Sequence, residues 1–130
     1  MTSLMNALTQ GVPLDLLVPG VRTTTASGTG VDVSAYEGMA IAVVQSLAGT
    51  GTTPTLNVKL QHCSTVGGTY ADISGAAFVE IDDTVGGSVQ LIAFNAAAVD
   101  GFVRATATIA GTTPSFTCSC VFVGVKKSVG

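Results

Sequence analysis

The chain contains no tryptophan, only one histidine and few charged residues. Asp, Glu, Lys and Arg make up 10% of its 130 residues, whereas apolar residues make up 47%, and globular proteins usually carry about 25% charged residues. A disordered chain would lack the aliphatic and aromatic residues that are plentiful here. The composition therefore predicts a single folded domain with a surface of hydroxyl groups, small apolar side chains and backbone. Large parts of such a surface could be buried against partners.

The scarcity of positive charge argues against a nucleic-acid partner. Five basic residues against eight acidic ones give a net charge of -3, and the only basic run is Lys126-Lys127. Binding to phosphates, by contrast, needs a clustered basic patch. No apolar run approaches the length of about 18 residues that a membrane-spanning helix needs. The first residues lack the basic segment of a secretion signal. We therefore expect no membrane partner and assembly in a cytosol.

Residues that could perform catalysis or hold a metal ion are sparse and poorly placed. His62 and Cys63 are adjacent on an expected strand, so their side chains point to opposite faces. Asp82 and Asp83 are the only acidic pair, and we expect them to cap a turn, with a weak calcium site as the alternative. The sequence has no nucleophile elbow, Walker loop or dinucleotide fingerprint. We predict no catalytic residues, no cofactor and no metal ion.

The three cysteines are expected to be free thiols. Cys118 and Cys120 lie two residues apart on one face of an expected strand, where regular geometry is unfavourable for a disulfide. Cys63 is an odd third cysteine in a chain without secretory features.

Two segments, Ala48–Leu56 and Ala110–Phe116, share an unusual order of residues. Each reads Ala-Gly, then Thr-Thr-Pro, a hydroxyl residue and a large apolar residue. β-Rich runs flank both segments, which predicts two long antiparallel hairpins. The main strands expected from the alternation of apolar and polar residues are Met39–Leu47, Leu56–Gln61, Phe102–Ile109 and Phe116–Val123.

The fold class expected from this pattern is all-β. About eight short strands with frequent turns predict a single-domain antiparallel β-sandwich, jelly-roll-like in topology, over residues 21–130. A parallel α/β fold is disfavoured because no amphipathic helical pattern of ten or more residues occurs.

Residues 1–20 differ in character and are expected to form an N-terminal arm. Pro13 and Pro19 hold the intervening residues extended. This segment could be a strand or flap that covers an open end of its own sandwich, or an arm that reaches a neighbouring subunit. The second alternative makes four apolar residues candidates for a partner interface: Leu14, Leu16, Leu17 and Val18.

Arg104 is the fifth candidate for a partner interface. It is the only charged residue in the expected strand Phe102–Ile109, so it must find an acceptor or reach solvent. We expect a structural or interface role for it. Its possible partners are Asp32, Glu37, Asp72 and Asp100.

Three segments resemble a known group of proteins. Val31–Val44 contains Val-Asp-Val-Ser-Ala-Tyr-Glu-Gly before a strand, Leu56–Gly75 is a strand–turn–strand unit, and Phe102–Phe116 begins a late strand with Phe-Val-Arg-Ala. These features resemble small β-rich structural proteins of tailed bacteriophages, above all the accessory head proteins that decorate or cement a capsid. The chain departs from many relatives at Ser64–Thr69, where they have an acidic turn, and its first 20 residues lie outside the resemblance.

The resemblance implies a virion protein on the outer capsid surface, assembled in the host cytoplasm. Its expected partners are the major capsid protein and its own copies, as a dimer or trimer. One alternative is a head–tail connector or tail protein of a phage. A carbohydrate-binding β-sandwich ranks lowest, because such modules stack sugars on exposed aromatic rings and the chain offers only Tyr36 and Tyr70 besides phenylalanines.

Overall fold

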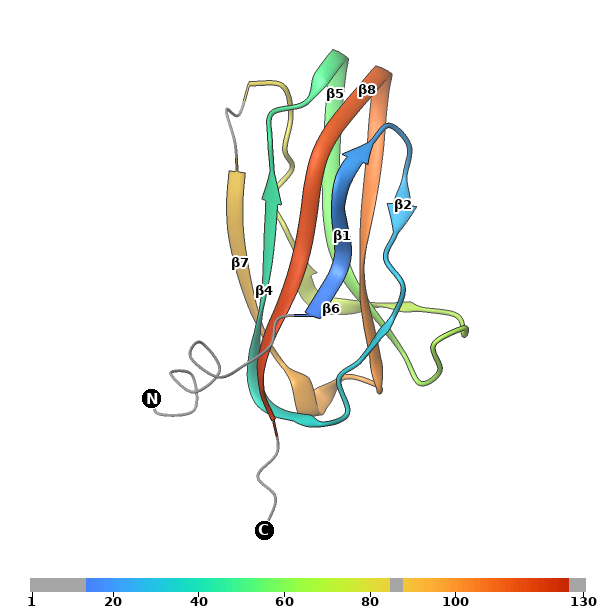
Figure 1. The fold of residues 1–130 in the computed structure, drawn as a ribbon, viewed down its shortest axis with the longest axis vertical. Helices are drawn as coiled ribbons and strands as arrows, with labels where there is room; N and C mark the ends of the chain where they lie inside the picture. The colour runs from blue at the N-terminus through green and yellow to red at the C-terminus, as the bar shows by residue number, and fades with distance from the viewer. Residues whose placement is uncertain (1–13, 85–87, 127–130) are drawn as a thin grey trace.

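The computed structural model describes residues 14–84 and 88–126, and this part of the chain is an all-β, antiparallel and nearly closed, barrel-like structure (Figure 1). Its only helix is the 3-10 turn η1 (Ala96–Ala98). None of its helices could span a membrane. The strands are β1 (Leu14–Arg22), β2 (Ala26–Ser27), β3 (Val31–Asp32), β4 (Tyr36–Ser46), β5 (Thr50–Cys63), β6 (Ala71–Ala77), β7 (Ser88–Asn95) and β8 (Phe102–Lys126).

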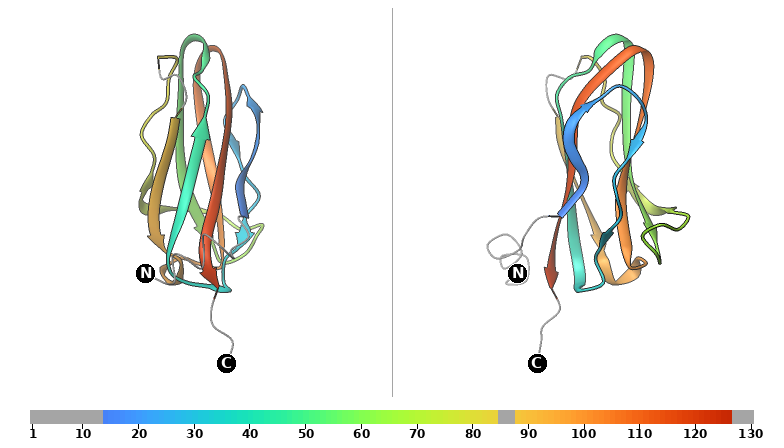
Figure 2. Two further views of the ribbon diagram at one scale, coloured as in Figure 1. Left: turned by 60° about the vertical axis from the view of Figure 1, so that its left-hand side comes forward. Right: turned by 45° about the vertical axis from the view of Figure 1, so that its right-hand side comes forward.

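The strands form two layers that face each other across the core (Figure 2). In the first layer, here called the β4 sheet, the order is β1, the second half of β8, β4 and β7. In the second, the β5 sheet, the first half of β8 lies between β5 and the short strands β2 and β3, and β6 lies on the other side of β5. Strand β8 thus belongs to both layers.

The two predicted hairpins are wrong in their pairing, because the strands on either side of each Thr-Thr-Pro turn lie in different sheets. The first half of β8 pairs with β5, and its second half pairs with β4 and β1. The connection from β4 to β5 makes the same change of sheet. At the corner the two turns pair with each other, with Thr50 opposite Ser115 and Thr52 opposite Thr112. The hydrogen-bonded ladder therefore continues around the corner, as it does where strands switch sheets.

The paired turns have closely similar backbone conformations. Gly51 and Gly111 have φ values of 111° and 117°, and Thr53 and Thr113 both have φ of 48°. A Cβ atom on Gly51 would overlap the carbonyl oxygen of Thr113, and one on Gly111 would lie 2.7 Å from that of Thr53. Each glycine is therefore required both by its backbone angle and by the close approach of the opposite turn.

The core follows the predicted alternation along β8. One face of the strand is buried before the corner and one after it. Three aromatic rings gather near the end opposite the corner, where Tyr36 packs edge-on against Phe122 at 5.0 Å and Phe94 lies 5.9 Å from Phe122, while Phe116 is buried beside the corner. Small residues on facing strands leave room for these rings. The buried residues of β8 are Val103, Ala105, Ala107, Phe116, Cys118, Cys120, Phe122 and Gly124, together with Thr106, whose side chain lies on the outer face with that of Gln61.

Residues 14–20 form most of β1, which runs across the predicted boundary between arm and domain. Leu16 and Leu17 are 0% and 1% exposed in the core of the same chain, whereas Val18 is 60% exposed. Leu14 pairs with Phe122 of β8 and packs against the core. This segment is thus a strand that covers its own domain, the first of the two alternatives. Residues 1–13 of the predicted arm lie outside the described residues.

Side chains and close packing join the two layers where their edges meet. The amide of Gln90 on β7 donates to the carbonyl of Val79 at 3.0 Å and accepts from its N–H at 2.8 Å. The Gln90 side chain therefore makes the two hydrogen bonds that a neighbouring strand's backbone would make with Val79, and it joins β7 to the segment after β6. At the other edge, Gly28 packs against the backbone of Leu16, and its N–H donates to the carbonyl of Ala105.

We predict that Leu16→Ala lowers the free energy of unfolding by about 2–5 kcal/mol, because it opens a cavity in a closely packed core. Val18→Ala, the matched control on the exposed side of β1, should change it by less than about 0.5 kcal/mol. Chemical denaturation of both variants measures the difference. Equal stability of the two variants would contradict the packing of β1 in its own domain.

A second prediction concerns the free energy of unfolding and the positive φ of Thr113 at the corner. A left-handed backbone costs a residue with a Cβ roughly 1–2 kcal/mol, and Asn tolerates it better than a β-branched residue. Thr113→Asn should therefore raise the free energy of unfolding by about 0.5–1 kcal/mol. Thr112→Asn, one residue earlier, is the control without a positive φ. If Thr113→Asn is no more stable than the control in thermal unfolding, the corner carries no such strain.

Candidate functional site

The outer face of the β4 sheet carries most of the exposed aliphatic surface. Of the eight large apolar residues exposed in the described structure, six lie in this sheet or directly at its end, and Val66 and Val79 are the two exceptions. Alternation along β4, β7 and β8 adds further outward aliphatic residues that are half-buried. We call the following set the aliphatic face: Met39, Ile41, Val43, Val89, Leu91, Ala93, Val121 and Val123.

Two rows of the aliphatic face are continuous across three strands, whereas Val89 shares its row with Gln45 and Ser119, and Met39 lies opposite Asn95. Val43 of β4 lies opposite Leu91 of β7 and Val121 of β8. The next row places Ile41 between Ala93 and Val123. The pairing of β4 with β7 has no register shift, so the side chains make a regular pleated surface. Asp15 of β1, opposite Val121, borders the first row.

The outer face of the β5 sheet is polar instead. Asn57, Lys59 and Gln61 alternate with buried residues along β5. The side-chain oxygen of Gln61 accepts hydrogen bonds from Nε and Nη2 of Arg104, at 3.0 and 2.9 Å, and from the hydroxyl of Thr106, at 2.9 Å. This pattern is typical of an antiparallel sheet with one solvated face.

Arg104 is held within the domain by residues other than those anticipated from the sequence. Its guanidinium lies 4.1 Å from the centre of the Tyr70 ring, a cation–π contact. Of the four suggested acidic partners, Asp72 is connected to it through Gln61, whose amide donates to Asp72 at 2.9 Å. Hydrogen bonds from Gln61 and Lys59 hold the pKa of Asp72 below its ordinary value. A contact of Arg104 with a partner protein stays a prediction.

The nucleophilic and titratable residues near the core have structural positions. The ring Nδ1 of His62 accepts a hydrogen bond from the backbone N–H of Asp100 at 2.9 Å. The three cysteines are free and buried, and burial, with a smaller effect of Cys118, raises the pKa of the Cys120 thiol to about 12. In residues 14–84 and 88–126, no three His, Cys, Asp or Glu side chains gather where they could hold a metal ion.

A cavity of about 470 Å³ lies between β6, the end of β7 and η1, a volume within the range of small-molecule sites. Three of its four polar side chains, all except Ser74, already have partners in the chain. Asp72 binds Gln61 and Lys59, His62 accepts from Asp100, and Asn95 accepts from the N–H of Ala97. The aliphatic face, whose side chains lack any covering segment among the described residues, is therefore the stronger candidate.

The sequence contained part of the signal for the aliphatic face. Both faces of the segment around Val121 are apolar, which predicts a strand that is central or covered on both sides. The structure makes this strand central, between β1 and β4, but leaves Val121 and Val123 partly open to solvent. The contributions of β7 were not anticipated, because its exposed face could not be identified without knowing its pairing.

Comparison with known proteins adds no relative. No protein-family model matches the chain, and no curated protein sequence matches it significantly. The resemblance to phage accessory head proteins therefore stays a prediction.

The polar network predicts the behaviour of Gln61→Leu. This change removes the acceptor that Thr106 and Arg104 share, while the Thr106 hydroxyl keeps its hydrogen bond with Ser27 at 3.0 Å, so the free energy of unfolding should fall by about 0.5–1.5 kcal/mol. The pKa of Asp72 should also rise toward its ordinary value, because its largest lowering cause is removed. Asn57→Leu, on the same face, is the control.

Nuclear magnetic resonance titration of the carboxyl groups measures this shift. A carboxylate with a lowered folded pKa stabilises the fold above its unfolded pKa and loses that effect as the pH falls through its folded pKa. The Gln61→Leu variant should therefore lose part of its acid dependence of stability. An unchanged pKa of Asp72 in that variant would contradict the described network.

Proposed function

We propose that this protein is a structural virion component that decorates or cements a tailed-bacteriophage capsid. In this role it binds the major capsid protein and its own copies on the outer capsid surface, after assembly in the host cytoplasm. The three resembling segments support the proposal. They cover the start of β4, the β5–β6 unit and the β8 corner, which together make up much of the framework.

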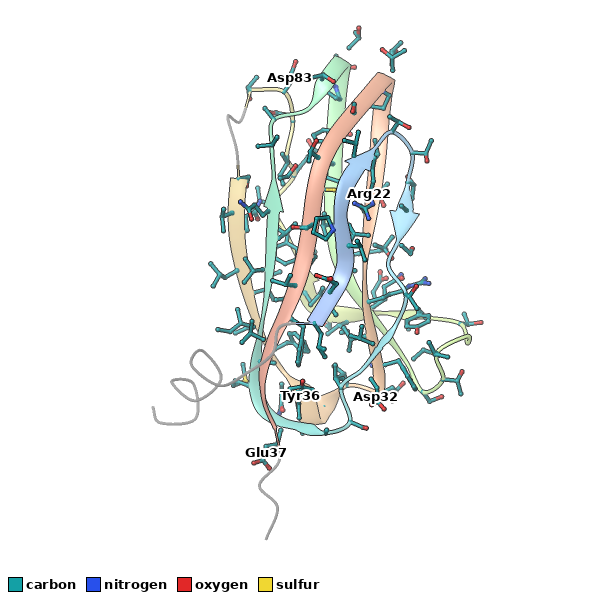
Figure 3. The ribbon with its side chains drawn as sticks, in the orientation of Figure 1. Arg22, Asp32, Tyr36, Glu37 and Asp83 are labelled. Carbon is teal, nitrogen blue, oxygen red and sulfur yellow. The ribbon has the colours of Figure 1, made fainter. Side chains whose placement is uncertain are left out.

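The observation that carries the proposal is the unequal character of the two outer faces. Apart from Asp15 and Arg22 of the edge strand β1, the charged residues lie on or beside the β5 sheet and toward the ends of the molecule, where Figure 3 shows Asp83 at one end and Asp32 and Glu37 at the other. Between these ends, the aliphatic face has no charged member. Exposed contiguous aliphatic surfaces of this kind are typical of sites where another protein binds. A protein that stabilises an assembly needs such a surface.

The proposed role is non-enzymatic and requires no cofactor, metal ion or nucleic acid. The positions of two candidate catalytic residues support this part of the proposal. His62 accepts a hydrogen bond from the backbone, and the carboxylate of Asp82 accepts from the N–H and hydroxyl of Thr84 in a turn. Both side chains thus stabilise local structure.

The proposal also extends to architecture and contact residues. Two layers joined by strands that switch sheets support a jelly-roll-like β-sandwich as the finer fold class. Among the apolar candidates, Val18 is the most accessible, while Leu16 and Leu17 would support it from the core. Arg104 faces outward on the polar sheet, where it could meet a capsid surface.

The alternatives differ in how the structure bears on them. A head–tail connector or tail protein would also need the aliphatic face to bind its neighbours. These roles are therefore distinguished by where the protein lies in the particle. A carbohydrate-binding module is disfavoured by the two tyrosines. Tyr36 is buried against Phe122, and one face of Tyr70 is covered by Arg104.

Phage particles purified from the host that carries this gene test the proposal. We expect mass spectrometry to find the chain in many copies per particle, and cryo-electron microscopy to place it on the outer capsid surface. Absence of the chain from intact particles would refute the proposal. Density only at the head–tail junction or in the tail would replace it with the connector or tail alternative.

A further inference from the structure

The outer face of the whole β4 sheet, which is the aliphatic face together with the edge strand β1, reaches the smallest size that an interface between two copies needs. Its four strands with a spacing of about 4.8 Å and about eight residues with a rise of about 3.3 Å span roughly 19 Å by 26 Å. Each copy would thus contribute on the order of 500 Å², and two copies about 1,000 Å², which is the lower bound for a specific protein interface. A contiguous patch of about 500 Å² has the size of the largest apolar patch on a typical monomer, and such patches are often binding sites.

The chemistry of this face fits an identical surface. Its eight members are aliphatic, so two copies would bring no like charges together at the centre of the contact. The polar side chains beside them are Gln45 and Ser119, in the row of Val89, and Asp15 on the edge strand β1, and they would lie toward the border, where interfaces are usually polar. The outer face of the β5 sheet differs, because pairing it with itself would bury Lys59, Asp72 and Arg104. The regular register of β4 with β7 also provides a smooth pleated surface, on which a second sheet can pack at about 10 Å.

From these observations we infer that the aliphatic face binds a second copy of this chain, sheet against sheet, around a two-fold axis. This inference specifies the self-association included in the proposed function and rests on that part of it. A two-fold axis brings the same patch of both copies together, and an aliphatic patch is complementary to itself. The polar β5 sheet and the ends of the molecule remain available for the capsid protein.

Lysine substitutions in the full-length chain test this inference. Val89→Lys places a charge within the aliphatic face, at a residue that is 62% exposed in the monomer. Val79→Lys is the matched control, because this valine is 75% exposed but lies outside the face. Sedimentation velocity over a range of concentrations gives the dissociation constant of each protein, and circular dichroism verifies the fold. Leu91→Lys, at an exposed position of the same strand, provides a second variant.

We expect wild type and Val79→Lys to dimerise with dissociation constants that agree within about twofold. Val89→Lys and Leu91→Lys should dissociate at least about tenfold more readily while remaining folded, because dimerisation would bury an unpaired charge. A wild type that stays monomeric at about 1 mM, a mass of three or more chains, or a dimer that both variants preserve would overturn the inference.

Particle binding separates this inference from the proposed function. A monomeric wild type that still decorates particles, and loses decoration with Val89→Lys, would show that the capsid protein occupies the face. That result would refute the inference and leave the proposed function intact. A dimer that Val89→Lys disrupts, together with particles that hold no copy of the chain, would support the inference and refute the proposed function.

Discussion

The structure depends on the corner at which two chain segments turn together from one sheet to the other. Gly51 and Gly111 approach the carbonyl groups of the opposite turn so closely that a side chain would not fit at either position. The ladder between β5 and β8 continues into the corner with two register shifts, and beyond the corner β8 pairs with β4 in the other layer. A slip by one residue would turn every inward side chain outward. The corner therefore determines which residues form the core and which form each outer face.

This constraint explains why the two outer faces can differ so strongly. Along β5 the outward positions hold Asn57, Lys59 and Gln61, and the hydrogen bonds of Gln61 connect them to β6 and β8. Along β4 and β7 the outward positions hold aliphatic residues such as Val43 and Leu91. Both faces belong to antiparallel sheets with buried side chains on the opposite side. The difference thus concerns contacts outside the domain more than folding, since an exposed aliphatic side chain contributes little to the stability of a monomer.

Much of the strand pattern could be predicted from the sequence, because burial on one face imposes a period of two residues. The inward residues of β8 and the strands near Met39–Leu47 and Leu56–Gln61 are examples. The pairing could not be predicted, since a Gly-Thr-Thr-Pro turn fits a hairpin and a sheet-switching corner equally well. The partners of Arg104 were also missed, because Gln61 and Tyr70 reach it only through the pairing of β5 with β8 and the loop before β6. The aliphatic face required knowledge of which strands lie side by side.

The central claim is that the aliphatic face is covered when the protein is assembled. The most direct measurement is the accessibility of methyl groups to a soluble paramagnetic probe, compared between dilute and assembled protein. We expect the methyl groups of Ile41, Val43 and Leu91 to become protected on assembly, while those of Val79 remain as accessible as before. Equal accessibility of Leu91 and Val79 in the assembled state would contradict the account.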